Sequence, residues 1–428
     1  MVKSSDPSDS SLSIYLIITI SSMAVSIANL EGSLRVLDLT RSTVTLSLAV
    51  TLYNIFFTIM SLSWTRLFFG RLSRRNIIIF SLSCLFAGLI LISSNSTAVV
   101  ITGTVLVGVS SAVFSPLLTT ILIDYTGKDV VAVARYNLLS SIGLITGYLM
   151  GGILEPVIGI HGILKLTSII TCSLIPIALL IPRKYAVIEP RRLMYISFIP
   201  HFTGRIRPLP SILFTPKIIY STRKLIGDLI RMAKMKLARK LPLMLLSTSV
   251  LFTGISVFFT PVPAFLRNLG FTDKEIFVIY LYSASISSTS YAAIHRQFHK
   301  SIYAWKPLVL STTIRIPIFL IPLPLIYLHT MKIINILTIG TMFTFTGITW
   351  AYITTSLSTL VISMSERGEK DFLLGQLNAS IGTGTIIGSI LSGIIFKYMN
   401  YAGIFIGASV LVGVSAILYY KAWKTLIT

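Results

Sequence analysis

Long apolar stretches recur along the whole chain, separated by short polar connectors. Each stretch is about 20 residues or longer, the length of helix that crosses the hydrocarbon core of a bilayer. The stretches are too continuous for β-barrel strands, and a backbone in lipid must satisfy its own hydrogen bonds. The pattern predicts an all-α integral membrane protein with twelve transmembrane helices, at residues 12–30, 43–64, 76–94, 98–123, 136–154, 162–182, 241–265, 276–294, 307–327, 333–362, 374–396 and 401–420.

The sequence also repeats itself at a constant offset of 241 residues. In that frame Asn137 aligns with Asn378, and glycines of residues 143–152 align with glycines of residues 384–393. Both segments start on the same side of the predicted membrane, so the repeat predicts two parallel six-helix halves around a central cavity. We expect an N-terminal half at 1–182, a basic cytoplasmic loop at 183–240 and a C-terminal half at 241–428.

The glycines in the two matched segments are candidate helix-packing positions, because a residue without a side chain lets neighbouring helices approach closely. They are Gly143, Gly147, Gly151, Gly152, Gly384, Gly388 and Gly393. The alternative is that these glycines are packing contacts of a static bundle, in which case function depends on the cavity and not on them.

The composition strengthens the membrane interpretation. Of the 428 residues, 54% are hydrophobic and only 12% are charged, where a soluble domain carries about 25% charged residues. The net charge of +22 raises the question of nucleic acid, but the basic residues lie in connectors beside apolar spans, where the membrane explains them. We therefore expect no nucleic-acid partner.

The distribution of Lys and Arg orients the chain. Connectors on the side of both termini hold most of the basic residues, even when the long loop is left out, so both termini are predicted to be cytoplasmic. Residues 1–11 hold one Lys and two Asp and lack the basic region of a signal peptide. We expect the first span to be retained, in a multi-pass protein of the cell membrane.

The loop at 183–240 contains a second membrane-related pattern. From Ile218 to Leu241, apolar residues recur at helical spacing with Lys and Arg around them. This pattern predicts a basic amphipathic helix lying on the anionic inner leaflet. The alternative is a solvated tether that joins the two halves.

The connector that follows the second span resembles a family signature. Residues 66–75 (RLFFGRLSRR) resemble the motif G-x-L-x-D-R-x-G-R-R of the major facilitator superfamily, with Arg71, Arg74 and Arg75 in its arginine positions and Gly70 in place of its Asp. The six-plus-six pattern with a long middle loop also resembles this family over nearly the whole chain. The resemblance implies a transporter that works by alternating access, through rocking of two halves.

Two further stretches bear on the resemblance. Gly147–Gly152 is similar to the glycine-rich antiporter signature but lacks its Pro, and Thr104 stands where many proton-coupled members carry a buried Arg. The latter departure disfavours proton-coupled drug export. The family also implies a cytoplasmic gate, here Asp124 with Arg71 or Arg74, beside Arg75. The alternative is that these charges only set the topology.

Charges inside apolar spans are functional candidates, because they are costly in a membrane. Arg315 lies within the ninth span, where either structural pairing or substrate contact would explain it. Glu31 ends the first predicted span and has Arg35 one helical turn away, so an interfacial ion pair competes with a role as coupling acid. No acid lies in the middle of a span, which favours a facilitator or coupling through Glu31 or Asp124.

Uncharged polar and aromatic residues in the spans that face the pathway of this family are candidates to line the central cavity. They are Asn29, Tyr53, Asn54, Tyr148, Trp350, Tyr352 and Asn378. Each of them would equally suit a helix–helix contact. Such groups suit a small, weakly polar or amphipathic solute. A strongly anionic or dicarboxylic solute is not expected, because it would require a buried Arg or Lys facing the cavity.

No catalytic constellation stands out, and we expect neither an enzyme nor a cofactor. His295 and His299 are four residues apart but lack nearby Asp, Glu or Cys, so no metal site is predicted. The function predicted is transport of a small-molecule substrate by a monomer. Two alternatives remain open: a lipid flippase or scramblase on the same scaffold, and a membrane receptor that transports nothing.

Overall fold

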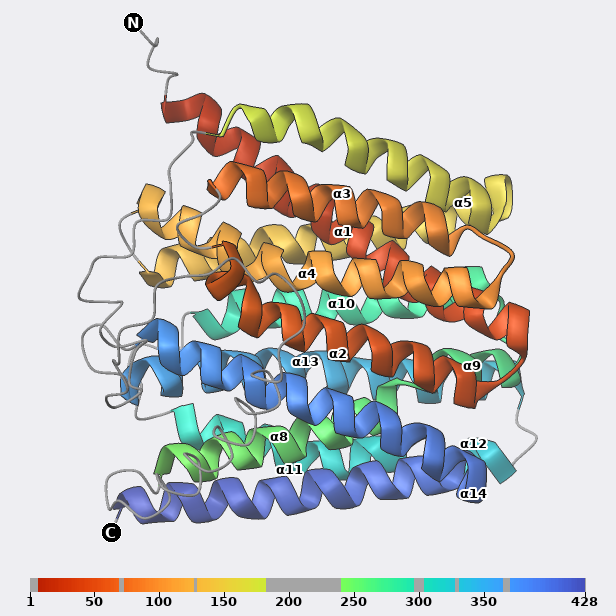
Figure 1. The fold of residues 1–428 in the computed structure, drawn as a ribbon. Coiled ribbons are helices and arrows are strands. Elements are labelled where there is room, and N and C mark those ends of the chain that lie inside the picture. Colours follow the sequence, from red (N-terminus) through yellow and green to blue (C-terminus); the bar gives the residue numbers. More distant parts are fainter. Residues whose placement is uncertain are drawn as a thin grey trace, which may run out of the picture.

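The computed structural model describes residues 7–68, 73–126, 129–181, 240–295, 304–327, 331–364 and 370–427, and within these ranges the chain is helical, without a β-strand. Long helices run roughly parallel or antiparallel to one another in one bundle (Figure 1). The helices are α1 (Pro7–Thr40), α2 (Thr43–Phe68), α3 (Arg74–Ile92), α4 (Thr97–Thr126), α5 (Asp129–Leu179), α8 (Lys240–Phe259), α9 (Val262–Asn268), α10 (Asp273–His295), α11 (Trp305–Leu320), α12 (Leu323–Tyr327), α13 (Lys332–Met364) and α14 (Lys370–Ile427).

The bundle has two ends, which we name by what they carry. At the terminal face, on the left of Figure 1, α1 begins and α14 ends. At the far face, on the right, lie the α1–α2 and α9–α10 connections. The basic loop predicted at 183–240 lies outside the described residues, apart from the first residue of α8.

Two of the helices reverse direction at a single residue. Gly159 in α5 has φ 67° and Asn400 in α14 has φ 54°, a region that Gly and, less readily, Asn tolerate. Straight, α5 would be about 75 Å long, more than twice the thickness of a membrane core. Each helix instead folds back at the far face into two legs (Figure 1), which correspond to the paired predictions 136–154 with 162–182 and 374–396 with 401–420.

Proline interrupts two of the predicted spans. The span predicted at 241–265 divides into α8 and α9, where Pro261 occupies the N-cap of α9. The span predicted at 307–327 divides into α11 and α12, with Pro322 between them. Proline has no N–H to donate and clashes with the preceding turn, so the helical ladder breaks there.

Nine helical segments of the described ranges are long and apolar enough to cross a membrane. Large apolar side chains are exposed on the bundle surface, among them Val157 and Leu337, a pattern that suits lipid and not water. The chain is thus a multi-pass membrane protein. Helix α10, predicted as a span, falls outside the nine because its serines, threonine and tyrosines lower its mean hydropathy.

Buried apolar side chains form two clusters that follow the order of the chain. One cluster is built from residues before position 182, except for Ala264. The other is built from residues after position 240, except for Leu30 and Leu34. Each part of the chain therefore packs mainly against itself.

The predicted glycines lie where helices approach most closely. A Cβ on Gly143 or Gly147 would come within 2.2 Å of an atom of α1, and one on Gly384 or Gly388 within 2.4 Å of an atom of α8. The contacted residues also correspond, because Thr19 and Met23 on α1 precede Ser249 and Thr253 on α8 by the same 230 positions.

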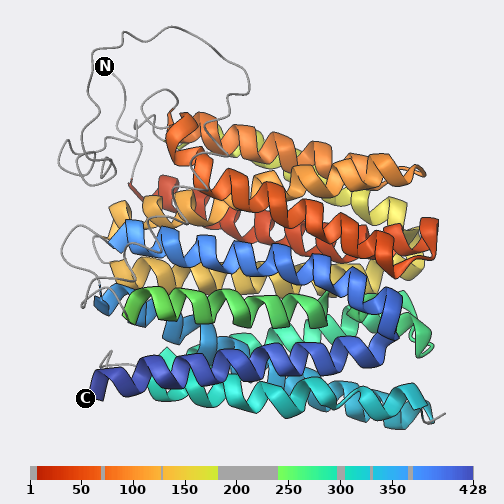
Figure 2. The same ribbon diagram turned by 60° about the horizontal axis from the view of Figure 1, so that its bottom comes forward.

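The other pair of matched contacts joins the two parts of the chain. Gly152 on α5 faces Phe277 on α10, and Gly393 on α14 faces Ser47 on α2. Ser47 precedes Phe277 by the same 230 positions. Figures 1 and 2 both show the first leg of α14 running between α2 and α8. The glycines thus allow close packing both within each part of the chain and between the two parts.

Candidate functional site

A cavity of about 770 Å³ lies inside the bundle between the two parts of the chain. Helices α1, α2, α5, α8, α10, α13 and α14 line it, with single residues from α4, α9 and α11. Its size lies within the usual range for small-molecule sites, about 300–1,000 Å³.

Most of the residues predicted to line a central cavity do so. The structure brings together Asn29, Tyr53, Asn54, Tyr148 and Trp350 around one space. Two predicted residues do not line it. Tyr352 follows Trp350 by two positions, about 200° around the helix, and therefore faces elsewhere. Asn378 is exposed, about one turn closer to the terminal face than the lining residue Ile381.

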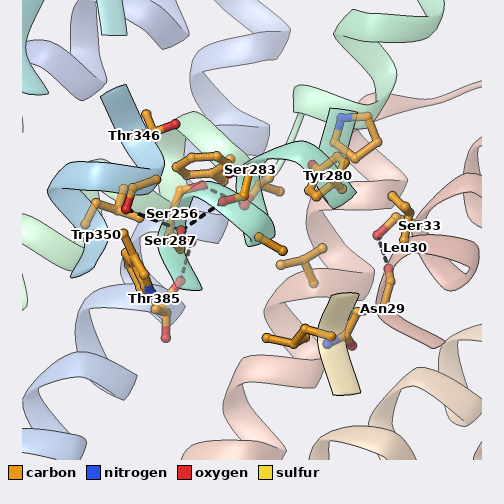
Figure 3. A pocket seen from close by; sticks show the side chains of 18 of the residues that line it. Asn29, Leu30, Ser33, Ser256, Tyr280, Ser283, Ser287, Thr346, Trp350 and Thr385 are labelled. Carbon is orange, nitrogen blue, oxygen red and sulfur yellow. Dashed lines mark hydrogen bonds between the residues drawn. The ribbon is translucent and has the colours of Figure 1, made fainter. Parts of the chain in front are cut away.

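The cavity also holds a set of hydroxyl groups that the sequence analysis missed. They come from Ser140, Ser141, Ser256, Ser283, Ser287, Ser288, Thr346 and Thr385. Figure 3 shows Ser256, Ser283, Ser287, Thr346, Trp350 and Thr385 on one side of the cavity and Asn29, Leu30 and Ser33 on the other. The signal available in the sequence was the run of serines in residues 283–290, which lowers the hydropathy of α10.

Two of these hydroxyls lie within hydrogen-bond distance of a carbonyl on a neighbouring helix. Ser256 Oγ donates to the Thr385 carbonyl oxygen at 3.0 Å (Figure 3). Ser287 Oγ lies 3.0 Å from the Ser283 carbonyl of its own helix and 3.3 Å from the Gly347 carbonyl on α13. Their protons are engaged with backbone, while the hydroxyl lone pairs can still accept hydrogen bonds from a solute. The cavity wall is therefore mostly apolar, with hydroxyl groups set into it and few charges.

Toward the far face the cavity is closed by aromatic packing between α5 and α10. The rings of Tyr148 and Tyr280 lie 5.7 Å apart, and a Cβ on Gly151 would come 2.2 Å from the Phe277 ring. Asn137 on α5 and Tyr291 on α10 lie nearer the terminal face than these tyrosines, and both line the cavity. The cavity therefore extends from the tyrosine pair in the direction of the terminal face.

An ion-pair group lies at the far face, beyond this packing. The Arg267 guanidinium binds both carboxylate oxygens of Asp273, through Nε at 2.9 Å and Nη2 at 2.7 Å. Its Nη1 donates to Asp38 Oδ1 at 2.5 Å and to the Leu34 carbonyl at 3.3 Å. Because Leu34 and Asp38 belong to α1, Arg267 ties α1 to α9 and α10. We call Arg267, Asp38 and Asp273 the far-face seal.

Glu31 lies beneath this seal, and its predicted pairing with Arg35 is wrong. Helix α1 continues to Thr40, so Glu31 is an interior residue with no exposed surface, and neither carboxyl oxygen has a partner among the described residues. Arg35 instead bonds to the Ser94 carbonyl, Asn95 and His161. Arg35 thus bonds to the α3–α4 connection and to α5, and not to Glu31 one helical turn away.

Arg315 also lines the cavity, and it is 1% exposed. Its Nε donates to Thr349 Oγ1 at 3.0 Å and its Nη2 to the Thr346 carbonyl at 3.2 Å, both on α13. The guanidinium carbon lies 5.5 Å from the centre of the Trp350 ring. The Nη1 group has no hydrogen-bond partner in the described part of the chain.

The predicted cytoplasmic gate is described only in part. Arg71 and the Asp124 side chain lie outside the description, so the pair between them stays a prediction. Of the neighbouring arginines, Arg75 donates from Nη1 to the Leu179 carbonyl at 3.4 Å, at the end of α5. Arg74 opens α3 next to Ser73, whose hydroxyl caps that helix.

Fold and cavity together define a multi-pass membrane protein with an internal binding space. The sequence profile of the Major Facilitator Superfamily matches residues 11–363, and the chain belongs to that superfamily. The resemblance seen in the sequence is thus confirmed. A search of curated proteins found no significant match.

Solved transporter structures share the fold. A POT family transporter in complex with 5-aminolevulinic acid aligns with a TM-score of 0.71 and 10% identity, over 97% of this chain and 96% of that one. A bacterial homologue of the human lysosomal transporter Spinster, inward-facing and unoccupied, aligns with 0.67 and 15%, over 99% and 98%. The human organic anion transporter MFSD10 aligns with 0.63 and 12%, over 97% and 100%. At these identities the likeness concerns the fold alone.

Proposed function

We propose that the chain is a membrane transporter, not an enzyme, which moves a small amphipathic solute by alternating access. The observation that carries this proposal is a cavity lined by apolar side chains and hydroxyl groups, between two groups of helices that each have their own apolar core. Two such groups are able to rock against each other without disrupting either core. Membership of a transporter superfamily supports the same conclusion.

The proposed architecture is twelve membrane crossings in two parallel halves, with boundaries at residues 182 and 241. Counting the two legs of α5 and of α14 separately adds two crossings to the nine, and α10 supplies the twelfth. The matched contacts of Gly143 and Gly147 with α1 and of Gly384 and Gly388 with α8 support a repeat of the same packing unit. Parallel repeats of this kind place the solute between the halves.

The proposed state of the structure is inward-facing. If the protein lies in the plasma membrane with both termini in the cytoplasm, the terminal face is the inner side. The cavity extends toward that face, and the far-face seal ties α1 to α9 and α10 on the outer side. In the opposite state we expect this seal to open and the predicted pair between Asp124 and Arg71 or Arg74 to form.

Glu31 is the proposed site of any proton coupling. Its carboxyl is buried beside the seal without a partner, and within electrostatic reach of Arg267, Asp38, Glu155 and Asp273. A charge buried in this way is costly unless it is neutralised or paired. Protonation of Glu31 and opening of the seal are therefore expected to affect each other.

Flux through sealed proteoliposomes tests the function directly. Uptake and efflux of pooled metabolites and dyes are measured with and without an imposed pH gradient. Gradient-dependent flux that Glu31→Gln uncouples, while flux down the solute's own gradient persists, supports a coupled carrier. Flux indifferent to the pH gradient supports a facilitator. If the folded protein moves no solute, the transport proposal is wrong, and labelled-lipid exchange and ligand binding then separate a flippase from a receptor.

A further inference from the structure

Arg315 occupies an unusual position for a charged residue in a membrane bundle. It is buried between α11 and α13, and an arginine stays protonated at neutral pH. Charged side chains are rare at such depth and mark substrate pathways by default, with their partner to be identified. The partner of Arg315 is therefore the question that its position raises.

The protein does not supply an anionic partner within the described residues. The guanidinium donates only to a threonine hydroxyl and a backbone carbonyl, and Nη1 is unpaired. No Asp or Glu that would neutralise the charge is among the described contacts of Arg315. By contrast, Arg267 binds two carboxylates.

The surroundings of Arg315 belong to the cavity. Trp350 and Tyr291 line it, the guanidinium lies over the Trp350 ring, and the Tyr291 hydroxyl bonds to Thr354 at 2.7 Å. Arg315 is the one Lys or Arg among the described residues that line this cavity. The expectation that an anionic solute is disfavoured assumed that no buried cation faces the cavity, and the position of Arg315 removes that assumption.

We propose that Arg315 is the anion-binding group of this transporter, and that its substrate is an amphipathic monoanion whose carboxylate pairs with Arg315. The inference rests on the proposed transport function and names the solute class. A planar guanidinium matches a carboxylate through charge-assisted hydrogen bonds, and here Nη1 has a donor to spare. A dianion would bring a second charge with no cation to meet it.

The rest of the cavity fits the body of such a solute. The rings of Phe252 and Trp350 lie 5.8 Å apart edge to face, and Tyr280 and Phe343 lie 5.5 Å apart. These four aromatic residues line the cavity. They provide apolar surface for an aromatic or alkyl group, while the hydroxyls on the same side accept hydrogen bonds from polar substituents.

A purely structural role for Arg315 predicts a different behaviour. If Arg315 only ties α11 to α13, its replacement lowers stability and alters no preference between ligands. The discriminating readout is therefore the ratio of affinities for a carboxylate and for its uncharged amide, measured on the same protein sample. That ratio is insensitive to the fraction of protein that is folded.

The experiment uses the full chain in lipid nanodiscs. Binding of aryl-alkyl monocarboxylates, their amides, the corresponding amines and a dicarboxylate is measured by tryptophan fluorescence and thermal shift. We expect the wild type to bind a monocarboxylate at least about tenfold more tightly than its amide. Arg315→Gln should weaken carboxylate binding about 30-fold and remove this preference. Arg315→Lys should keep part of it, and the matched control Arg35→Gln all of it.

The proposal is overturned if no monocarboxylate binds the wild type, if amides or amines bind as well, or if folded Arg315→Gln keeps the preference. Should Arg315→Gln fail to fold, the wild-type ratio and Arg315→Lys still decide. Flux of the same probes separates the two proposals. Binding through Arg315 without flux contradicts transport, whereas flux of uncharged solutes that is unaffected at Arg315 contradicts this inference.

Discussion

Two arginines sit between helices of this bundle, and their partners differ. Arg267 at the far face binds Asp38 and Asp273 and joins α1 to α9 and α10. Arg315 beside the cavity binds only uncharged groups of α13. The charge of Arg267 is neutralised within the protein and serves closure. The charge of Arg315 is left for a ligand, so burial alone does not tell what an arginine does.

The difference also bears on which interactions must change during a transport cycle. The contacts of Arg267 cross from the first part of the chain to the second, so they have to break if the far face opens. The contacts of Arg315 stay within the second part. Arg315 can therefore keep its position while the two parts of the chain move, which is useful for a binding group.

Arg267→Gln is expected to have the largest effect on the balance between states with the far face closed and states with it open. This change leaves Asp38 and Asp273 without their cation, and hydrogen bonds to charged groups are worth about 1.5–3 kcal/mol. Access from the far face should rise roughly 30-fold. The measurement is the labelling rate of Ser33→Cys, a cavity residue, by an impermeant maleimide added to that side, with Cys84 and Cys172 replaced by alanine.

Arg35→Gln is the matched control, because Arg35 lies at the same face but bonds within the first part of the chain. Its labelling rate should equal that of the parent. Equal labelling of the Arg267→Gln variant and the parent would show that the seal does not hold the far face closed.

A smaller effect is expected from two neighbouring glycines that differ in their surroundings. A Cβ on Gly151 would lie 2.2 Å from the buried Phe277 ring, whereas one on Gly152 would meet its nearest atom at 3.4 Å. Overpacking of this kind costs about 1–3 kcal/mol. Gly151→Ala should therefore raise far-face labelling about tenfold, and Gly152→Ala should change it little. Equal effects of the two variants would contradict closure by this contact.

The smallest effect concerns Glu275 at the start of α10. A 2.6 Å bond from Lys332 and the backbone N–H of Thr272 hold the pKa of Glu275 below its usual value. The ionised form is thus favoured in the folded protein, so the stabilisation is present at neutral pH and is lost as the pH falls through the lowered pKa. Because the pair is partly exposed, it is worth at most about 1 kcal/mol.

Glu275→Gln should accordingly lower the thermal unfolding midpoint slightly at pH 7 and not at pH 3, relative to the parent. Differential scanning fluorimetry at the two pH values checks this, with Lys332→Met as a variant that removes the same pair. A larger loss at low pH than at neutral pH would mean that the sign is wrong.

The length and continuity of apolar segments predicted the helices well, because a membrane imposes both. Their ends were less predictable. Helix α1 runs past Glu31 to Thr40, since Leu34, Val36 and Leu37 are buried against other helices. Hydropathy sets a minimum length for a span and does not indicate where tertiary contacts let the helix stop.

The rotation of each helix about its own axis was the other missing information. Arg315 was recognised as a buried charge, but spans that are apolar on every side do not reveal which face meets the cavity. The same gap explains why Trp350 lines the cavity and Tyr352 does not. The serines of α10 line it because α10 packs between α5 and α13, an arrangement that no local pattern shows.

The most direct test of the contrast between the two arginines is counterflow of a labelled aryl-alkyl monocarboxylate in proteoliposomes. The same carboxylate and its amide are tested with four proteins: wild type, Arg315→Gln, Arg315→Lys and Arg267→Gln. We predict exchange of the carboxylate by the wild type, its loss in Arg315→Gln, partial retention in Arg315→Lys, and unchanged preference for carboxylate over amide in Arg267→Gln. Undiminished carboxylate exchange by folded Arg315→Gln, or loss of the preference in Arg267→Gln, would contradict the separate roles assigned to them.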